Sequence, residues 1–283
     1  MSEQNFKTFN TAWCPGCGNF SLLSSLKMAL EELGKKPEEV LMVAGIGQAA
    51  KTPQYISANS FCGLHGRALP AAAAAKIANE KLTVIVSTGD GDSYGEGGNH
   101  FIHNIRRNTN ITHFVHDNQI YGLTKGQASP TSDQGIVTNV QVTGNINQPL
   151  NPLLIAIAAG AGFVARGFVG HKEQLVSIMK AAIEYDGYAL VDIFQPCVSF
   201  NKVNTFSYYK NHVYELDADY DSSNKLKAMG KVMEDEDKIP IGILYKEQLK
   251  TFHEKNSVLK DSIPLLDKKT KVTTINKFMK EFV

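Results

Sequence analysis

A short apolar run that ends in a glycine- and aspartate-rich turn constrains the fold of this chain more than any other feature. Residues 82–87 read LTVIVS, which is rich in β-branched residues and has no charged face. Such a strand is typical of the interior of a parallel sheet that helices cover on both sides. The run leads directly into GDGDSYGEGG at residues 89–98, so we expect the strand to end in a tight turn before a helix.

The segments around this run alternate between strand-like and helix-like patterns. Further strands are expected at residues 40–44, 111–116 and 188–194, and helices at residues 20–33, 70–79, 100–107, 152–161 and 171–185. The alternation predicts an α/β domain over residues 1–200 with a doubly wound, mostly parallel sheet, in which ligands bind at the carboxyl ends of the strands. Residues 201–283 are too polar for a separate core, so we expect a C-terminal extension that wraps this domain or contacts another subunit.

The composition disfavours two classes of partner. The chain has 29 basic and 28 acidic residues and a formal net charge of +1, so it has no basic field that would attract nucleic acid. The longest nearly uncharged apolar run, residues 153–165, is shorter than the roughly 18 to 20 residues that a membrane-spanning helix needs. The N-terminal stretch MSEQNFKTFN lacks the apolar segment of a signal peptide, so the cytoplasm is the expected compartment.

Side chains whose oxygen atoms could bind a metal ion follow two of the expected strands. Asp90 comes directly after residues 82–87, and Asn118 follows the strand expected at residues 111–116. Carboxylate and amide oxygens beside flexible glycine backbone suit a magnesium–diphosphate site, because glycine lets backbone N–H groups approach the phosphates. A nicotinamide site is disfavoured, because GDGDSYGEGG does not have the Gly-x-Gly-x-x-Gly spacing. An ordinary turn would explain GDGD alone, but not the second element DNQIYGLT.

The chain has four cysteines, and in the cytoplasm we expect them to be reduced. Cys14 and Cys17 form a CPGC turn, while Cys62 and Cys197 are isolated in sequence. A thioredoxin-like pair is disfavoured because the preceding residues are too polar for a buried strand. A zinc site would be expected to show a second close pair, whereas a [4Fe–4S] cluster accepts scattered thiolates. Alternatively, the isolated Cys62 and Cys197 are free thiols that pack as small apolar side chains and bind no metal.

Two histidines on one expected strand invite a metal hypothesis that the strand geometry disfavours. His113 and His116 are three positions apart within residues 111–116. Residues at odd spacing point to opposite faces of a strand, so the two rings are not expected to share a metal ion.

The two oxygen-bearing motifs together resemble the thiamine-diphosphate motif. The wider stretches at residues 89–111 and 117–132 closely resemble the β subunit of 2-oxoacid:ferredoxin oxidoreductases. WCPGCGN, LHGRALP, QPCVSFN and KIPIGILY resemble the same subunit, so the likeness covers nearly the whole chain. The resemblance implies that the chain has the thiamine-diphosphate-binding fold, specifically the half that binds the diphosphate. It also implies an enzyme that uses thiamine diphosphate, Mg²⁺ and a [4Fe–4S] cluster.

The resemblance assigns site residues position by position. Mg²⁺ would be held by Asp90, the Asn118 side chain and the Ile120 carbonyl. The remaining contacts to thiamine diphosphate would come from the glycine-rich turns and the neighbouring loops, namely Ile46, Gly47, Gln48, His65, Gly91, Asp92, Gly122 and Leu123. From its position seven residues after Asn118, Lys125 is the cation that we expect near a substrate carboxylate or coenzyme A, with an exposed loop lysine as the alternative. Lys125 and His65 are the expected catalytic residues.

Three cysteines match the cluster ligands of this family, namely Cys14, Cys17 and Cys197. The family usually has a further cysteine in the turn GIGC, where this chain has Gln48. Glutamine is a poor substitute for a thiolate on iron. We therefore hypothesise that Cys62 takes the missing position, and the competing outcome is a cluster with three cysteines and a labile iron.

The resemblance implies a reaction and a set of partners. The reaction is the oxidative decarboxylation of a 2-oxoacid, either 2-oxoglutarate or pyruvate, with coenzyme A as acyl acceptor and ferredoxin as electron acceptor. The glutamate that acts at the pyrimidine ring would come from an α subunit, in an αβ or (αβ)₂ assembly. One alternative is a non-redox thiamine-diphosphate decarboxylase or synthase subunit, but such a subunit would not need the CPGC motif. The other is a non-catalytic iron–sulfur electron-transfer subunit, which would not explain the GDGD motif.

Overall fold

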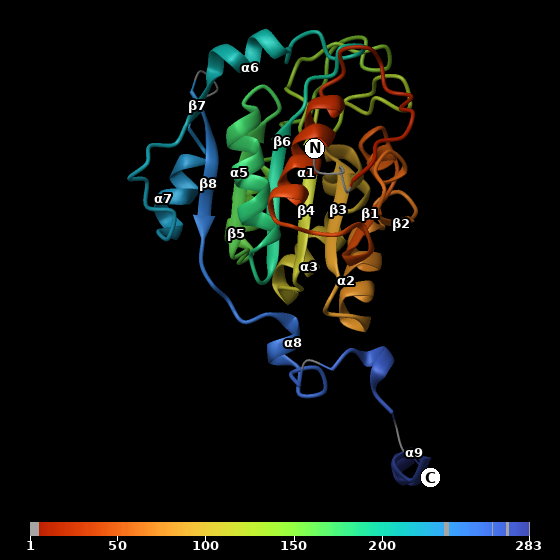
Figure 1. Ribbon diagram of the computed structural model, residues 1–283. Coiled ribbons are helices and arrows are strands. Elements are labelled where there is room, and N and C mark those ends of the chain that lie inside the picture. The colour runs from red at the N-terminus through yellow and green to blue at the C-terminus, as the bar shows by residue number, and fades with distance from the viewer. Residues whose placement is uncertain (1–5, 235–237, 262, 270–271, 283) are drawn as a thin grey trace.

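The computed structural model describes residues 6–234, 238–261, 263–269 and 272–282, so the first five residues of the N-terminal stretch lie outside it. Within these ranges one sheet runs through the molecule with helices on both faces (Figure 1). Its strands are β1 Val40–Ala44, β2 Asn59–Cys62, β3 Thr83–Gly89, β4 Ile111–Asp117, β5 Phe163–Phe168, β6 Tyr188–Phe194, β7 Val213–Glu215 and β8 Ile239–Lys246. The helices are α1 Asn19–Glu32, α2 Ala68–Ala78, α3 Gly98–Arg107, α4 Pro152–Ala158, α5 Lys172–Ile183, α6 Phe206–His212, α7 Lys225–Lys231, α8 Phe252–Lys255 and α9 Val272–Met279.

The strand order is β2-β1-β3-β4-β6-β5-β8-β7. Neighbouring strands are parallel except for β5 and β8, which pair antiparallel. The predicted doubly wound, mostly parallel sheet is therefore confirmed. No helix in the described ranges is long and apolar enough to cross a membrane.

Two apolar clusters cover the two faces of the sheet. On one face α1 and α5 pack together, and α5 buries Leu175, Ile178, Met179 and Ala182, which recur at helical spacing. On the other face α2, α3 and α4 form the second cluster. All seven residues of β4 are buried, as are all seven of β6. Burial on both faces explains why the central strands have no alternating polar pattern.

Most expected elements lie within two or three residues of their observed bounds, and the differences have local causes. The helix expected from Pro70 begins at Ala68, and proline is accepted there because the first turn of a helix has unpaired N–H groups. The apolar run 153–165 contains both α4 and the start of β5, which the sequence pattern did not separate. The strand β2 was not predicted either, because its four exposed residues carry no apolar pattern.

Residues 201–283 contribute directly to the sheet. Their strand β8 pairs with β5, and α7 contacts both α4 and β8. Ala228, Val232 and Leu244 belong to the apolar cluster of α2, α3 and α4. After β8 the chain runs past the amino ends of the central strands to α8 and α9, at the end of the molecule opposite the long loop that follows β4 (Figure 1).

Candidate active site

The expected oxygen ligands meet at the carboxyl ends of β3 and β4. Gly89 of β3 pairs with His116 of β4, so Asp90, just after β3, lies beside Asp117, the last residue of β4. Both carboxylates are buried, with Asp90 only 1% exposed. The Thr131 hydroxyl oxygen lies 2.7 Å from Asp90 Oδ2 and 2.9 Å from Asp117 Oδ1, and it connects the two side chains.

Burial strongly perturbs these carboxylates. The pKa of Asp90 is raised from 3.8 to about 6, chiefly by loss of solvation and also by the nearby charge of Asp192, while hydrogen bonds from Ser129 and Thr131 oppose the shift. Burial, and then the charges of Asp192 and Asp90, raise the pKa of Asp117 well above its ordinary value. Negative charge gathered out of water is the condition under which a divalent cation binds strongly.

A cavity beside Asp90 gathers the residues that the sequence predicted for the cofactor. Its wall includes all eight predicted contact residues and the three predicted Mg²⁺ ligands: Ile46, Gly47, Gln48, His65, Gly91, Asp92, Gly122 and Leu123, with Asp90, Asn118 and Ile120. These residues come from the loops after β1, β2, β3 and β4. The tertiary structure therefore brings together segments that are far apart in the sequence.

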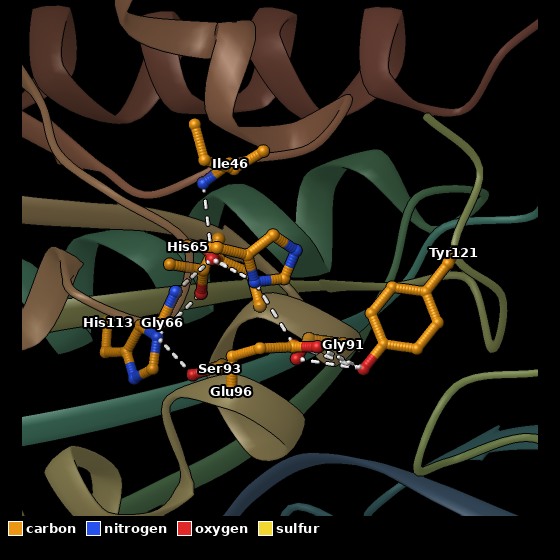
Figure 2. A network of polar contacts seen from close by, with 10 residues as sticks. Ile46, His65, Gly66, Gly91, Ser93, Glu96, His113 and Tyr121 are labelled. Atoms are coloured by element: carbon orange, nitrogen blue, oxygen red, sulfur yellow. Dashed lines mark hydrogen bonds and ion pairs between the residues drawn. The ribbon is translucent and has the colours of Figure 1, made fainter. Parts of the chain in front are cut away.

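Asp92 ties three of these loops together. Its Oδ1 accepts hydrogen bonds from the backbone N–H groups of Gly66 at 2.7 Å and Ile46 at 3.2 Å. His65 Nδ1 lies 3.3 Å from the same oxygen and 3.1 Å from Glu96 Oε2 (Figure 2). Asp92 Oδ2 is buried and has no hydrogen-bond partner within the described part of the chain, so this carboxylate keeps one oxygen unpaired.

Tyr121 closes one side of the cavity and was not identified from the sequence. Its hydroxyl donates to Glu96 Oε2 at 3.1 Å, as Figure 2 shows. A Cβ on Gly91 would lie 2.1 Å from a ring carbon of Tyr121, so only glycine fits there. Burial and the charge of Glu96 raise the pKa of the Tyr121 phenol, which therefore stays protonated as a donor. Tyr121 lies within the motif DNQIYGLT, so the resemblance was the available signal for it.

Two glycines leave open space where a ligand could approach the backbone. Gly89 and Gly122 line the cavity, and a Cβ on either would meet no atom within 4 Å. Gly47 also lines it and has a φ of 127°, a conformation that other residues rarely adopt. A cradle of bare backbone beside a buried aspartate fits a diphosphate with its cation.

Lys125 lies apart from this cavity. Its side chain is exposed, and it is not among the residues that form the cavity wall. Its backbone φ is 82°, which is strained for a residue with a side chain. The catalytic role of Lys125 stays a prediction.

Three of the four cysteines line a second cavity. Cys14, Cys17 and Cys197 share it with Gln48, whereas Cys62 does not line it and lies exposed on β2. In the described part of the chain, no three His, Cys, Asp or Glu side chains converge on a single metal ion. The cysteines of a [4Fe–4S] cluster need not converge on one ion, because each of them binds a different iron atom. The position of Cys62 gives no support to the hypothesis that it is the fourth ligand.

The polar groups around these thiols are suited to hold sulfur. Ser199 Oγ donates to Cys14 Sγ at 3.2 Å, and Gln195 Nε2 donates to Cys17 Sγ at 3.5 Å. The CPGC turn closes with a hydrogen bond from Cys17 N to Cys14 O at 3.0 Å. Before this turn the described residues form only an isolated bridge, Thr8 with Ile56, which agrees with the absence of a preceding buried strand.

The two cavities share a wall. Gln48, Asn118 and Gly122 line both of them. A group bound in one cavity is therefore separated from a group in the other by a single layer of residues. This adjacency could not be read from the sequence, because Gln48 and the residues after β4 meet only in the folded sheet.

The two strand histidines face opposite sides of β4, as predicted. His113 Nδ1 lies 2.7 Å from the Tyr188 hydroxyl, and His116 Nδ1 lies 2.7 Å from Asn19 Oδ1 at the start of α1. Burial lowers the pKa of each ring from 6.5 to about 3, so both histidines are neutral. Their hydrogen bonds connect β4 to Tyr188 and to Asn19.

Known families match most of the chain. Residues 40–193 match the family described as thiamine pyrophosphate enzyme, C-terminal TPP binding domain, and residues 197–261 match the C-terminal family of the pyruvate ferredoxin oxidoreductase β subunit. The boundary between the two matches falls just before Cys197.

Relatives and a solved structure agree with these matches. The chain is 45% identical over 247 residues to the β subunit of 2-oxoacid:ferredoxin oxidoreductase 2 from Aeropyrum pernix, covering 83% of this chain and 80% of the relative. It is 44% identical over 255 residues to the corresponding subunit from Saccharolobus solfataricus, covering 86% and 84%. It also superimposes on 2-oxoglutarate:ferredoxin oxidoreductase from Magnetococcus marinus with a TM-score of 0.91 and 34% identity, covering 99% of this chain and 96% of that one. The chain thus belongs to the β subunits of the 2-oxoacid:ferredoxin oxidoreductases and carries their thiamine-diphosphate-binding domain.

Proposed function

We propose that this subunit, in complex with an α subunit, catalyses the coenzyme A-dependent oxidative decarboxylation of a 2-oxoacid and passes the electrons through a [4Fe–4S] cluster to ferredoxin. The observation that carries the proposal is the shared wall between the two cavities, formed by Gln48, Asn118 and Gly122. A site for thiamine diphosphate next to a site for an electron acceptor is what an oxidative reaction needs. A non-redox decarboxylase or synthase subunit would have no use for the second cavity.

Asp90, the Asn118 side chain and the Ile120 carbonyl would hold Mg²⁺. The support is the burial of Asp90 without a cationic partner among its contacts, together with the open backbone at Gly89 and Gly122. When bound, thiamine diphosphate supplies the carbon nucleophile that attacks the keto carbon of a 2-oxoacid. The protein residues bind and orient the diphosphate end and exclude water from it.

His65 and Asp92 would act at the mouth of the cavity. Asp92 holds the loops at Ile46 and Gly66, and this fixes the wall against which the thiamine would lie. His65 is held near two carboxylates and is the nearest predicted proton carrier. Lys125 would act on the substrate or coenzyme A from an exposed position next to Thr124, which lines the cavity.

The α subunit, which the family implies, would supply the glutamate that acts at the pyrimidine ring. Ile46 and Leu123 line the cavity and remain 38% and 39% exposed, so they offer an apolar rim for that subunit. Residues 201–283 would form part of the subunit contacts, and an αβ or (αβ)₂ assembly is proposed.

The Magnetococcus marinus enzyme was solved with 2-oxoglutarate, coenzyme A and succinyl-CoA bound, and several relatives are 2-oxoglutarate synthase or oxidoreductase subunits. We therefore propose 2-oxoglutarate as the substrate ahead of pyruvate.

The test uses this subunit purified together with its α partner. A panel of 2-oxoacids is offered with coenzyme A, and reduction of ferredoxin and formation of the acyl-CoA are measured together. We expect the greatest turnover with 2-oxoglutarate, and none from the β subunit alone. Asp90→Asn should abolish turnover, and Asp219→Asn, at a distant exposed carboxylate, serves as the matched control. Decarboxylation without ferredoxin reduction would contradict the proposal and favour a non-redox enzyme.

A further inference from the structure

Gln48 lines the cysteine cavity as well as the cavity beside Asp90, and its side chain carries an unsatisfied oxygen. It lines the cysteine cavity together with Cys14, Cys17 and Cys197. Its Oε1 is buried and has no hydrogen-bond partner among the residues that the structure describes. A buried amide oxygen without a partner is unfavourable, so its presence calls for a group that the protein alone does not provide.

The loop that carries Gln48 is anchored to the CPGC segment. Trp13, next to Cys14, donates from its indole Nε1 to the Gln48 carbonyl at 2.9 Å. The Trp13 ring is buried and packs edge-on against Phe20 and Tyr55. Gln48 is thus held beside the three cysteines by a packed aromatic group.

Cys62 is held elsewhere by the sheet. It is the last residue of β2, paired in register with Ala44 of β1, and the next residue donates from Gly63 N to Ala44 O at 2.8 Å. Cys62 is exposed and does not line the cysteine cavity. No residue of β2 lines that cavity.

We propose that Cys14, Cys17 and Cys197 bind the cluster as thiolates and that the Gln48 amide oxygen faces the fourth iron. This inference rests on the proposed function, from which it takes the cluster. An amide oxygen is a neutral and weak ligand where iron–sulfur clusters prefer thiolates, so the fourth iron is exchangeable. With one thiolate fewer the site carries one negative charge less, and this raises the reduction potential of the cluster.

The exchangeable iron gives the cluster a defined oxidation product. A [4Fe–4S]²⁺ core gives one electron to an oxidant such as ferricyanide, which is reduced to ferrocyanide. The bonds from the fourth iron to its sulfides and to the Gln48 oxygen then break, and this iron leaves as Fe²⁺. A [3Fe–4S]¹⁺ core remains on the three thiolates, so both charge and electrons balance.

The test is iron loss from the complex with the α subunit, purified without oxygen and treated with one equivalent of ferricyanide. Iron is counted per β chain, and EPR detects the three-iron core. The wild type and Cys62→Ser should lose one iron in four and show the three-iron signal. Gln48→Cys should keep its iron and have a lower reduction potential, while Gln48→Ala should lose the iron faster than the wild type. These readouts do not depend on turnover, which Gln48 substitutions would also affect because Gln48 lines the thiamine cavity.

Two results would overturn the inference. In the first, the wild type keeps all its iron and Cys62→Ser loses one, so that Cys62 is the fourth ligand. In the second, the oxidised wild type and Gln48→Cys behave alike. A preparation that binds thiamine diphosphate but never contains iron would instead refute the cluster in the proposed function, so the two failures can be told apart.

Discussion

The Thr131 hydroxyl lies between Asp90 and Asp117, within 3 Å of an oxygen of each carboxylate. It has a single proton to donate, so it can hold only one of the two carboxylates at a time through that hydrogen bond. Thr131 is itself buried, so water cannot replace it. Thr131 is therefore a positioning residue for the expected cation ligand.

Replacement of this hydroxyl tests that role. Thr131→Val keeps the side-chain shape but removes the donor, and we expect Mg²⁺-dependent binding of thiamine diphosphate to weaken by about tenfold to a hundredfold, as for a lost hydrogen bond to a charged group. Thr131→Ser keeps the hydroxyl and should bind within a few-fold of the wild type. Calorimetric titration at fixed Mg²⁺ measures both variants. Equal affinities of the valine and serine variants would refute a positioning role.

The raised pKa of Asp90 predicts opposite effects of pH on stability and on binding. In the cation-free protein the folded-state pKa of about 6 exceeds the ordinary value of 3.8, so the proton is bound more tightly in the folded state. The contribution of Asp90 to stability is then full below pH 3.8 and is lost as the pH rises through about 6. The proton competes with Mg²⁺, so binding weakens as the pH falls.

Below pH 6 we expect the Mg²⁺-dependent affinity for thiamine diphosphate to fall by about tenfold per pH unit. Titrations at several pH values measure the slope. Asp90→Asn binds more weakly, and its remaining slope reports the protonation of the diphosphate itself. The prediction fails if the wild type and this variant have the same slope.

The buried histidines make the folded state sensitive to acid. Because burial lowers the pKa of His113 from 6.5 to about 3, the folded state resists protonation while the unfolded chain accepts it. The stabilising contribution is present above pH 6.5 and is lost as the pH falls toward 3. Between these limits the free energy of unfolding should fall by about 1.4 kcal/mol per pH unit for this ring.

Comparison of the wild type with His113→Gln isolates the pH dependence of stability that comes from His113. Asp90 has the opposite effect, but it is present in both proteins. We expect the variant to be less stable at neutral pH, where it loses the contacts with Tyr188 and Thr88. Its stability should fall less steeply on acidification than that of the wild type. Urea denaturation at a series of pH values gives the two slopes, and parallel slopes would contradict the expectation.

A pair of glycine substitutions separates binding from folding. Gly89→Ala places a methyl group in the open space of the cavity without meeting any protein atom within 4 Å, so we expect thermal stability to be kept while thiamine diphosphate binding is lost or weakened at least tenfold. Gly98→Ala is the matched control, because Gly98 also has open space but lies in α3 and not in the cavity wall. It should bind normally and gain about 0.5–1 kcal/mol of helix stability.

The strand ends and the chemistry placed on them were predictable because they depend on neighbours in sequence. The apolar run before Asp90 and the one before Asn118 each mark a buried strand, and a polar residue directly after such a strand lies at the edge of the sheet. The roles of Thr131, Tyr121 and Glu96 were not predictable from pattern. They lie in loops or in the π-helical turn after β3, where no period relates sequence to position.

The sequence by itself determined the layered α/β fold, the positions of Asp90 and Asn118 at strand ends, and the family to which the chain belongs. Only the tertiary structure decided that Gln48 stands beside Cys14, Cys17 and Cys197 while Cys62 stands on the edge of the sheet. The reason is physical. The spacing of apolar residues shows which side chains are buried along one helix or strand. Which distant loops come together depends instead on the strand order and on the packing of single side chains such as Trp13.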